Sequence, residues 1–568
     1  MKAVVIIVLA AIFLFAGYVV YGAWLAKKWG IDPTRKTPAI KLKDGVDYVP
    51  AKPGVLMGHH FSSIAGAGPI NGPIQAAVFG WVPVFLWCVL GSIFIGGVHD
   101  FGALFASIRN DGKSLGEIIK TTMGERTKKL FLVFSLFLVV LAIASFVNVV
   151  SNTLASMSNR IGVVASPDAN ESTAIITLGF ILIALIYGFL TNNLNLNYKL
   201  ATVICLVLVG LLIAFGMNVG IAMNGSFWIV FIGIYICIAA LIPVWILLQP
   251  RDYLSSFLLY ALMGVAVIGV FVSAFSGNVT FDMPAFTSIK PKEGYYLFPT
   301  LFTTVACGAC SGFHALVATG TTSKQLSNER DAKKIGYGAM LVEAFLAIIS
   351  LIAAGMVFSG FMNDEFSAPS VVFATGIGLM YGTEGSAVYN IIYSLLILAV
   401  SVFVLTSLDT CARLGRYILS ELFLNEGEKT YKDAKNPVRK FFANPVVSTV
   451  LIVGVSGTIG SLKLSVIWGM FGSANQLLAG IALMAICSWL GNIGKNNKMF
   501  YIPMGFMLVT ALINLVVIVV GKLNNIISGA SGWGDYFQII VSLAMIVLVG
   551  ILVKESVKVL TDGRKGKR

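Results

Sequence analysis

Two short stretches of this 568-residue chain combine helix breakers with polar side chains inside otherwise apolar segments. The first follows a pair of histidines and places three glycines, two prolines and Asn71 within residues 66–73. Proline removes a backbone donor and glycine weakens a helix, so we expect this stretch to be unwound. Unpaired backbone groups are costly in hydrocarbon, so an unwound stretch at membrane depth must line an enclosed or watery cavity.

The second stretch, residues 306–324, carries three glycines, several hydroxyl side chains and a histidine. Breaks at matched positions in two halves of a chain indicate the substrate site of a secondary transporter, because half-helix ends attract anions and freed carbonyls coordinate cations. Close helix packing by small residues is the alternative interpretation, and the matched positions favour binding. The predicted substrate-binding residues are Ser62, Ser63, Gly66, Gly68, Asn71, Gly308, Ser311, Gly312, His314 and Thr319.

Ionisable residues within the apolar segments are candidates for ion coupling, because a charge there costs about 2.5–3.5 kcal/mol on insertion scales. His314 could titrate near neutral pH or bond a carboxylate substrate, and Glu343 could carry a proton. Each has a structural alternative: a histidine bonded to a facing carbonyl, or a glutamate paired with a buried donor. His60, at the entrance of the first broken segment, is the third candidate.

Cys307, Cys310 and His314 have the residue types and the spacing of a metal-binding or redox motif. On a helix, positions three and four apart share a face, yet three ligands without a partner cluster make a weak zinc site. We therefore interpret the cysteines as small packing residues and predict no metal and no cofactor.

His99, Asp100 and Asp409 stand where apolar segments end. At such positions an acidic side chain commonly caps a helix or pairs with a nearby arginine. We therefore expect these three residues to have structural roles and not to move charge.

The composition explains which elements must position these residues. The chain is 57% hydrophobic and 12% charged, about half the charged fraction of a soluble domain. Its formal net charge of +14 is spread over loops, without a basic stripe, so we expect no nucleic acid partner. We predict a single all-α polytopic membrane domain with about fifteen transmembrane helices, near 3–25, 60–80, 82–99, 130–153, 173–191, 200–223, 227–248, 254–276, 297–321, 336–361, 387–408, 444–461, 466–490, 500–521 and 535–553.

The distribution of basic residues supports this topology. With the N-terminus outside and the C-terminus cytoplasmic, 34 of the 40 lysines and arginines fall on the cytoplasmic side. Setting the first helix aside, the next seven and the last seven form halves of opposite topology, each led by a broken helix. A five-plus-five core with two extra helices per half fits equally well. The predicted boundaries are 1–57 for the N-terminal helix and loop, 58–276 and 295–553 for the repeats, and 554–568 for a basic tail.

Several motifs resemble the carbon starvation protein family of bacterial carriers. The resemblance implies a bacterial inner membrane protein of the amino acid–polyamine–organocation superfamily, with a LeuT-type inverted repeat whose two broken helices hold the substrate. It also implies uptake of peptides, or of pyruvate by proton symport, during nutrient limitation. Thr406 and Ser407 resemble the hydroxyl pair that holds sodium in LeuT-type carriers, although hydroxyls more commonly bond their own helix. The matching segments are 58–70, 97–101, 114–117, 243–253, 311–315, 408–413 and 468–476.

We predict a secondary active transporter that imports a small carboxylate such as pyruvate, or short peptides, through the lipid bilayer by proton symport. A sodium-coupled symporter of the same fold and a membrane nutrient sensor are the alternatives. The sensor hypothesis rests on the basic segment 409–443. That segment is too short for a catalytic domain, which weighs against the hypothesis. A membrane enzyme would need an acid, a base and a nucleophile placed together, and the sequence shows no such set of residues.

Overall fold

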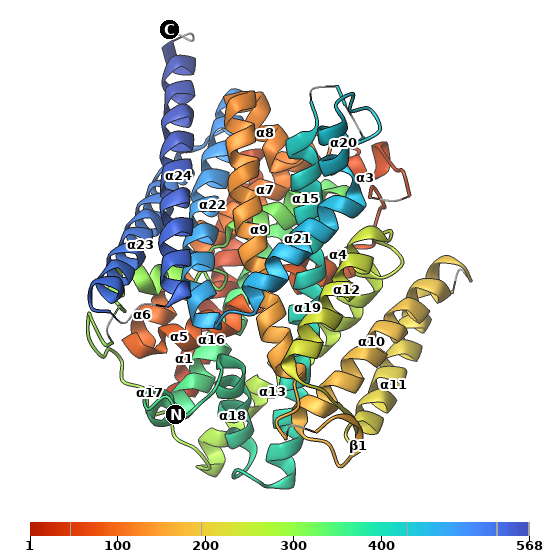
Figure 1. Ribbon diagram of the computed structural model, residues 1–568, viewed down its shortest axis with the longest axis vertical. Coiled ribbons are helices and arrows are strands. Elements are labelled where there is room, and N and C mark those ends of the chain that lie inside the picture. The colour runs from red at the N-terminus through yellow and green to blue at the C-terminus, as the bar shows by residue number, and fades with distance from the viewer. Residues whose placement is uncertain are drawn as a thin grey trace.

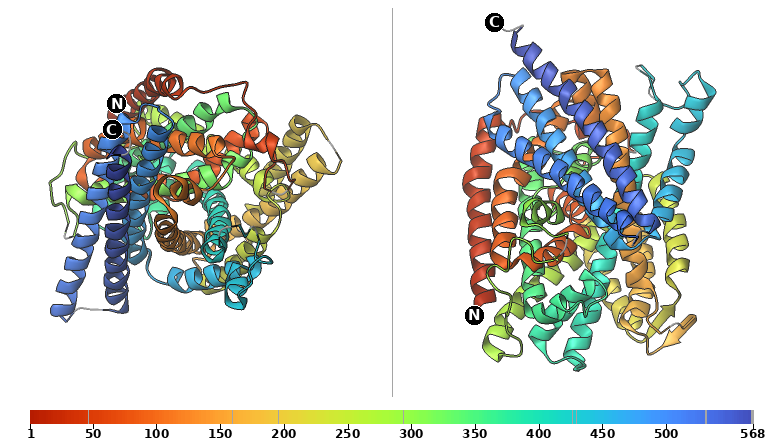
Figure 2. Two further views of the ribbon diagram at one scale, coloured as in Figure 1. Left: turned by 90° about the horizontal axis from the view of Figure 1, so that it is seen from above. Right: turned by 60° about the vertical axis from the view of Figure 1, so that its left-hand side comes forward.

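The computed structural model describes residues 1–565 apart from 46, 159, 195, 293, 426, 429, 530 and 531. Most of the described chain is helical, and the two termini lie toward opposite ends of the molecule (Figures 1 and 2). Residues 566–568 of the predicted basic tail lie outside the described residues. The architecture is the predicted all-α polytopic one.

Eleven segments of the described chain are long and apolar enough to cross a membrane, or twelve if a pair bent by 66° is one span. Each of the fifteen predicted segments is at least partly helical, but fifteen full spans are not confirmed. Four predicted segments are not among the eleven. Those near 60–80 and 297–321 are broken helices, α12 has 17 residues, and α21 follows the 66° bend. Hydropathy counts apolar residues and does not detect a break in the axis. The eleven are Lys2–Trp29, Trp81–Arg109, Glu125–Leu154, Ala169–Asn192, Tyr198–Gly216, Leu248–Ser276, Glu329–Met356, Ala387–Phe423, Val466–Asn492, Lys498–Ile527 and Trp533–Glu555.

The first broken helix consists of α4 (Pro53–Ile64) and α5 (Gly68–Ala76), separated by residues 65–67. The predicted unwinding over 66–73 is therefore wrong in its extent. Pro69 falls in the first turn of α5, where its missing N–H is an orphan anyway, and the helix also includes Pro73. We call residues 65–67 the first break.

The second broken helix begins with η4 (Leu297–Leu301) and α14 (Phe302–Thr304) and resumes as α15 (Gly312–Gly320). Residues 305–311, which we call the second break, are not helical. The two predicted interruptions are thus both present, and the second is the longer.

Contacts between helices are mirrored around the two broken helices. α5 packs on α16 as α15 packs on α7, and α4 packs on α13 as α15 packs on α22. α9 and α19 pack against each other along the centre, and α12 packs against α21. Two sets of five helices, one from each half of the chain, therefore make matching contacts. The two sets are α4–α5, α6–α7 (Trp81–Leu86, Gly97–Arg109), α9 (Glu125–Leu154), α12 (Gly225–Leu241) and α13 (Leu248–Ser276), and α14–α15, α16 (Gly338–Met356), α19 (Ala387–Phe423), α21 (Pro445–Gly460) and α22 (Leu464–Asn492).

Other helices surround this core. α10 and α11 pack on each other and project at one side, and α23 and α24 pack together at another (Figures 1 and 2). Strands β1 (Gly162–Ala165) and β2 (Val219–Ala222) pair antiparallel at the ends of the projecting helices. The loop predicted at 362–386 contains the short apolar helix α18. The remaining helices are α1 (Lys2–Ala16), η1 (Gly17–Gly22), α2 (Ala23–Trp29), α3 (Pro38–Lys41), η2 (Ala77–Phe79), η3 (Trp87–Gly96), α8 (Leu115–Met123), α10 (Ala169–Asn192), α11 (Tyr198–Gly216), η5 (Thr322–Lys324), η6 (Glu329–Asp331), η7 (Lys333–Tyr337), α17 (Phe358–Met362), α18 (Pro369–Tyr381), α20 (Pro437–Ala443), η8 (Lys498–Phe500), α23 (Tyr501–Ile527) and α24 (Trp533–Lys565).

Candidate functional site

A buried ion group, which we call the first-break group, consists of His59, Arg251, Asp252 and Asp409. His59 Nδ1 lies 2.6 Å from Oδ2 of Asp252, which also accepts a hydrogen bond from Ser63 Oγ at 3.2 Å. Arg251 pairs with Asp409, and its Nη2 lies 3.3 Å from Oδ1 of Asp252. All four side chains are buried, so this group joins α4, α13 and α19 around a permanently charged guanidinium.

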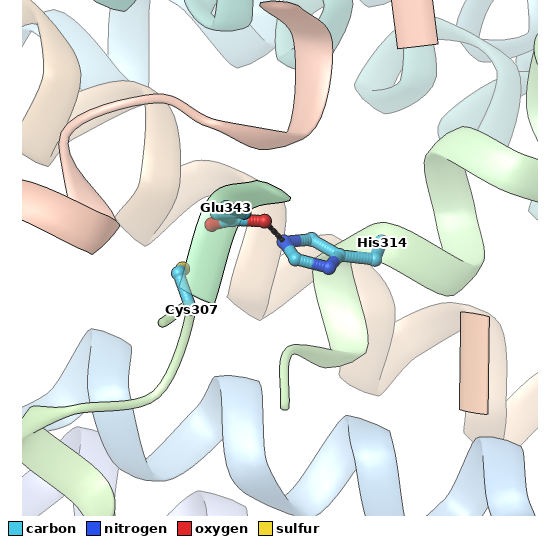
Figure 3. A group of neighbouring side chains, drawn as sticks. All are labelled: Cys307, His314 and Glu343. Atoms are coloured by element: carbon cyan, nitrogen blue, oxygen red, sulfur yellow. Dashed lines mark ion pairs between the residues drawn. The ribbon is translucent and has the colours of Figure 1, made fainter. Parts of the chain in front are cut away.

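A second buried cluster, the second-break group, consists of Asp100, Cys307, His314 and Glu343. His314 Nδ1 lies 2.8 Å from Oδ2 of Asp100, and its Nε2 lies 3.3 Å from Oε2 of Glu343. Cys307 stands in the second break facing the other end of the glutamate (Figure 3). His99 completes the chain of contacts, because its Nδ1 lies 2.7 Å from the remaining oxygen of Asp100.

The second-break group contains no permanent cation. Among the described residues, no lysine or arginine forms an ion pair with Asp100 or Glu343. Neither carboxylate oxygen of Glu343 forms a hydrogen bond, and His314 Nε2 forms none beyond its ion-pair contact with Oε2. Buried polar groups normally have hydrogen-bond partners, so these atoms are the ones in the group with bonding capacity left over.

Glycines at and beside the breaks allow close approach: the start of α5 meets the second break, the first break meets α19, and the start of α15 meets α22. A Cβ on Gly68 would lie 2.4 Å from Sγ of Cys307, and a Cβ on Gly66 would lie 2.7 Å from Oγ of Ser407. A Cβ on Gly312 would lie 2.5 Å from the carbonyl oxygen of Asn475 in α22. Only a residue without a side chain fits at these positions, because a Cβ contact under 3.0 Å forces a shift of the neighbour.

The predicted substrate-binding residues fall mostly around this contact. Ser62 Oγ donates to the carbonyl of Asp252 at 3.0 Å, and Ser311 Oγ bonds the side chain of Asn475. The side-chain nitrogen of Asn71 is buried without a partner. The structure brings together Ser62, Ser63, Gly66, Gly68, Gly308, Ser311, Gly312 and His314 near the two breaks.

Thr319 is engaged away from the breaks. Its hydroxyl donates to the carbonyl of Ala315 and accepts the backbone N–H of Leu115 at 3.3 Å. It therefore joins the end of α15 to the start of α8.

The predicted coupling residues separate into different environments. His314 and Glu343 belong to the second-break group, whereas His60 Nδ1 lies 2.9 Å from Oγ1 of Thr322. Thr406 donates to its own helix at the carbonyl of Val402, which is the commoner role of a helix hydroxyl. Ser407 donates to the carbonyl of Ser62 at 3.2 Å and so reaches the first broken helix.

The expectation that His99, Asp100 and Asp409 stand at helix ends is wrong, whereas the expected pairing of an acidic side chain with an arginine is present at Asp409. α7 continues to Arg109 and α19 to Phe423, so these residues lie inside helices and not at their ends. Asp100 bonds two histidines, and Asp409 pairs with Arg251. The helices extend beyond their apolar segments, which hydropathy alone does not reveal.

Two cavities approach the buried centre from different directions. One of about 680 Å³ is lined by Thr319 and Leu414 together with residues of α8 and the start of α9. The other, of about 610 Å³, is lined by Thr303 and Thr304 at α14 and by residues of α22 and α23. The side chains of both break groups are buried, so neither cavity exposes them, and the centre is occluded.

Sequence reasoning did not select Asp100, Arg251, Asp252 and Asn475 as site residues. Asn475 accepts the backbone N–H of Phe313 at 2.9 Å, so it caps the start of α15. Three of the four lie in segments that carry the family resemblance, 97–101 and 243–253, and the fourth lies in 468–476. The polar residues within these segments were the sequence feature that could have identified the four residues.

Known proteins match this chain over most of its length. The family described as "Carbon starvation protein CstA" matches residues 2–371 and 363–514. "Peptide transporter CstA" of Bacillus subtilis (strain 168) is 31% identical over 90% of this chain and 89% of its own. "Pyruvate/proton symporter BtsT" of Escherichia coli (strain K12) is 32% identical over 84% of this chain and 76% of its own.

Among solved structures, a manganese transporter of Eremococcus coleocola aligns with 91% of this chain at 12% identity and a TM-score of 0.48. That likeness is too low to locate a substrate or a side chain. The sequence matches, by contrast, extend through both broken helices and both break groups. The chain belongs to the carbon starvation protein CstA family.

Proposed function

We propose that this chain is a secondary active transporter of the bacterial inner membrane that imports pyruvate or short peptides by proton symport. The observation that carries the proposal is an occluded polar centre at the contact of two broken helices, with a cavity on either approach. A centre that opens to one cavity at a time is what alternating access requires. The names of the two relatives support both substrate classes, and both classes carry a carboxylate.

We assign the substrate carboxylate to the amide ends of α5 and α15. Helix N-termini favour anions, and the start of α5 contacts the second break, which leads into α15, where Gly68 meets Cys307. The unpartnered side-chain nitrogen of Asn71 supplies a further donor. A dipeptide and pyruvate share the anionic end, so their discrimination depends on the space beside it.

We assign the coupling proton to His59 in the first-break group. One arginine faces two carboxylates there, so a proton on His59 brings the buried group to neutrality. The facing polar groups are Asp252, Arg251 and Ser63, with Gln325 Nε2 3.2 Å from His59 Nε2. Because His59 joins α4 to α13, its protonation alters how one half of the first broken helix is held.

The sodium alternative and the sensor alternative have less support. Of the two hydroxyls suggested for sodium, only Ser407 reaches the first broken helix. α19 runs to Phe423, which shortens the segment between helices from the predicted 409–443 to 424–436. Roles for His60, His314 and Glu343 in coupling stay predictions.

Proteoliposomes that contain the purified chain test the transport proposal. We expect labelled pyruvate or a labelled dipeptide to accumulate when the outside is made acidic, and not when a sodium gradient is imposed instead. Accumulation of neither substrate under any gradient would refute transport. Accumulation driven by sodium alone would transfer the coupling to the Ser407 region.

The variants His59→Gln and Asp252→Asn test the coupling residue. We expect both to lose gradient-driven accumulation while they retain exchange of internal for external substrate, because the substrate site is intact. Asp364→Asn is the matched control, since Asp364 is exposed and pairs with Lys292. Normal accumulation by His59→Gln would remove His59 from the coupling mechanism.

A further inference from the structure

Three side chains of different chemistry converge in the second-break group. The ligand atoms of Cys307, His314 and Glu343 all lie within 4.8 Å of one another, and all three residues are buried. They come from the second break, α15 and α16, and Figure 3 shows the thiol and the imidazole on either side of the carboxylate. We propose that these residues bind a divalent transition-metal ion of the Zn²⁺ class, a site distinct from the proton assigned to His59.

The distances suit a tetrahedral zinc ion. Zinc binds sulfur at about 2.3 Å and nitrogen or oxygen at about 2.0–2.2 Å, which places neighbouring ligand atoms roughly 3.3–3.7 Å apart. The separation between His314 Nε2 and Glu343 Oε2 is 3.3 Å. The remaining pairs of ligand atoms lie within 4.8 Å, so the cysteine and glutamate side chains would have to move closer together when the ion binds.

The unsatisfied atoms of the group are the second, independent observation. Both oxygens of Glu343 and Nε2 of His314 are buried and form no hydrogen bond, and the only contact among these three atoms is the ion pair between Nε2 and Oε2. Leaving such groups unpaired is costly, and more so for a carboxylate. A metal ion at their common centre satisfies all three atoms and supplies the positive charge that the group lacks.

The surrounding residues orient the ligands as outer partners of metal sites do. Asp100 accepts the Nδ1–H of His314 at 2.8 Å, which directs the Nε2 lone pair toward Glu343. His99 in turn bonds Asp100 at 2.7 Å. The side-chain amide of Asn475 donates to Sγ of Cys307 at 3.6 Å, a hydrogen bond that stabilises a thiolate.

The ligand set also selects the ion. Ca²⁺ and Mg²⁺ prefer oxygen ligands, whereas one thiolate, one imidazole and one carboxylate suit Zn²⁺ and its neighbours. Three protein ligands leave a fourth position open to water, as in sites that bind or activate a ligand. Gly68 approaches Cys307 from the start of α5, next to the first break, so the ion would stand beside the contact of the two broken helices.

Metal analysis of the purified full-length chain tests the proposal. After incubation with ZnCl₂ and removal of free metal by gel filtration, we expect about one zinc per wild-type chain. Cys307→Ser, His314→Gln and Glu343→Gln should each retain close to none. Cys310→Ala is the matched control, because Cys310 is buried three residues from Cys307 and is not among the three ligands, and it should retain wild-type zinc.

Cobalt supplies a spectroscopic readout that loss of folding does not imitate. The wild-type chain loaded with Co²⁺ should show intense visible bands of a tetrahedral ion and a thiolate-to-cobalt charge-transfer band, and Cys307→Ser should lose the latter. Equal zinc in the wild type and in all three variants would overturn the proposal, as would a wild type without zinc. Both results leave the transport assay unaffected, so failure of the metal site and failure of transport are distinguishable.

Discussion

The first-break and second-break groups each bury two carboxylates and histidines, but they balance charge differently. In the first-break group Arg251 lies between Asp252 and Asp409 as a permanent cation. In the second-break group the ion pairs that Asp100 and Glu343 form among the described residues are with histidines, and neither carboxylate pairs with a lysine or arginine. The buried charge of the second group is compensated by a proton or by an added cation, and the metal ion proposed above is such a cation. A fixed cation provides structure, and a group without one is open to a cation that binds and leaves.

Removal of the fixed cation should have the largest effect. Arg251→Leu leaves Asp252 and Asp409 buried without it, and we expect a loss of about 3–5 kcal/mol in the free energy of unfolding. Thermal unfolding in detergent and the yield of folded protein measure this loss. Arg330→Gln, at an exposed arginine, should be neutral. A fully stable Arg251→Leu protein would contradict the role of Arg251 as the compensating charge.

Neutralising one carboxylate in each group sharpens the comparison. Asp409→Asn orphans Arg251 and should also cost about 3–5 kcal/mol in unfolding free energy. Glu343→Gln leaves no buried lysine or arginine without its partner, so in metal-free protein it should cost less than about 1 kcal/mol. Comparable destabilisation by the two variants would contradict the absence of a permanent cation from the second-break group.

Added zinc should stabilise the molecule through the second-break group alone. Binding of an ion at one hundred times its Kd adds about 2.7 kcal/mol to the unfolding free energy. We expect the melting temperature of the wild type and of Cys310→Ala to rise with ZnCl₂ and that of Cys307→Ser to stay unchanged. A rise in Cys307→Ser equal to the wild-type rise would place the zinc elsewhere.

The sequence predicted the fold well where one segment suffices to specify the structure. Hydropathy located the helices, glycine with proline located the first break, and glycine with polar side chains located the second. The extent of the first break was wrong because Pro69 begins a helix instead of ending one. The spacing argument for the cysteines assumed that Cys307 and Cys310 share one face of a helix, whereas residues 305–311 are not helical.

The site partners could not be read from local patterns because they are distant in sequence. Asp252 lies 193 residues from His59, and Asp100 lies 214 residues from His314. Helical periodicity tells which face of a helix is apolar and not which partner covers it. Only the mirrored packing of the two halves brings these residues together.

The smallest predicted effect concerns the residue that orients the zinc ligand. In Asp100→Asn the carboxylate that accepts the His314 proton becomes an amide, so the imidazole is held less well. Loss of such an outer partner commonly weakens metal affinity about 10–100-fold, without removing the site. Competition with a zinc-binding dye should therefore show a weakened site that Glu343→Gln abolishes. Unchanged affinity in Asp100→Asn would mean that His314 is oriented by α15 itself, and the contrast between the two groups would then reduce to the presence or absence of Arg251.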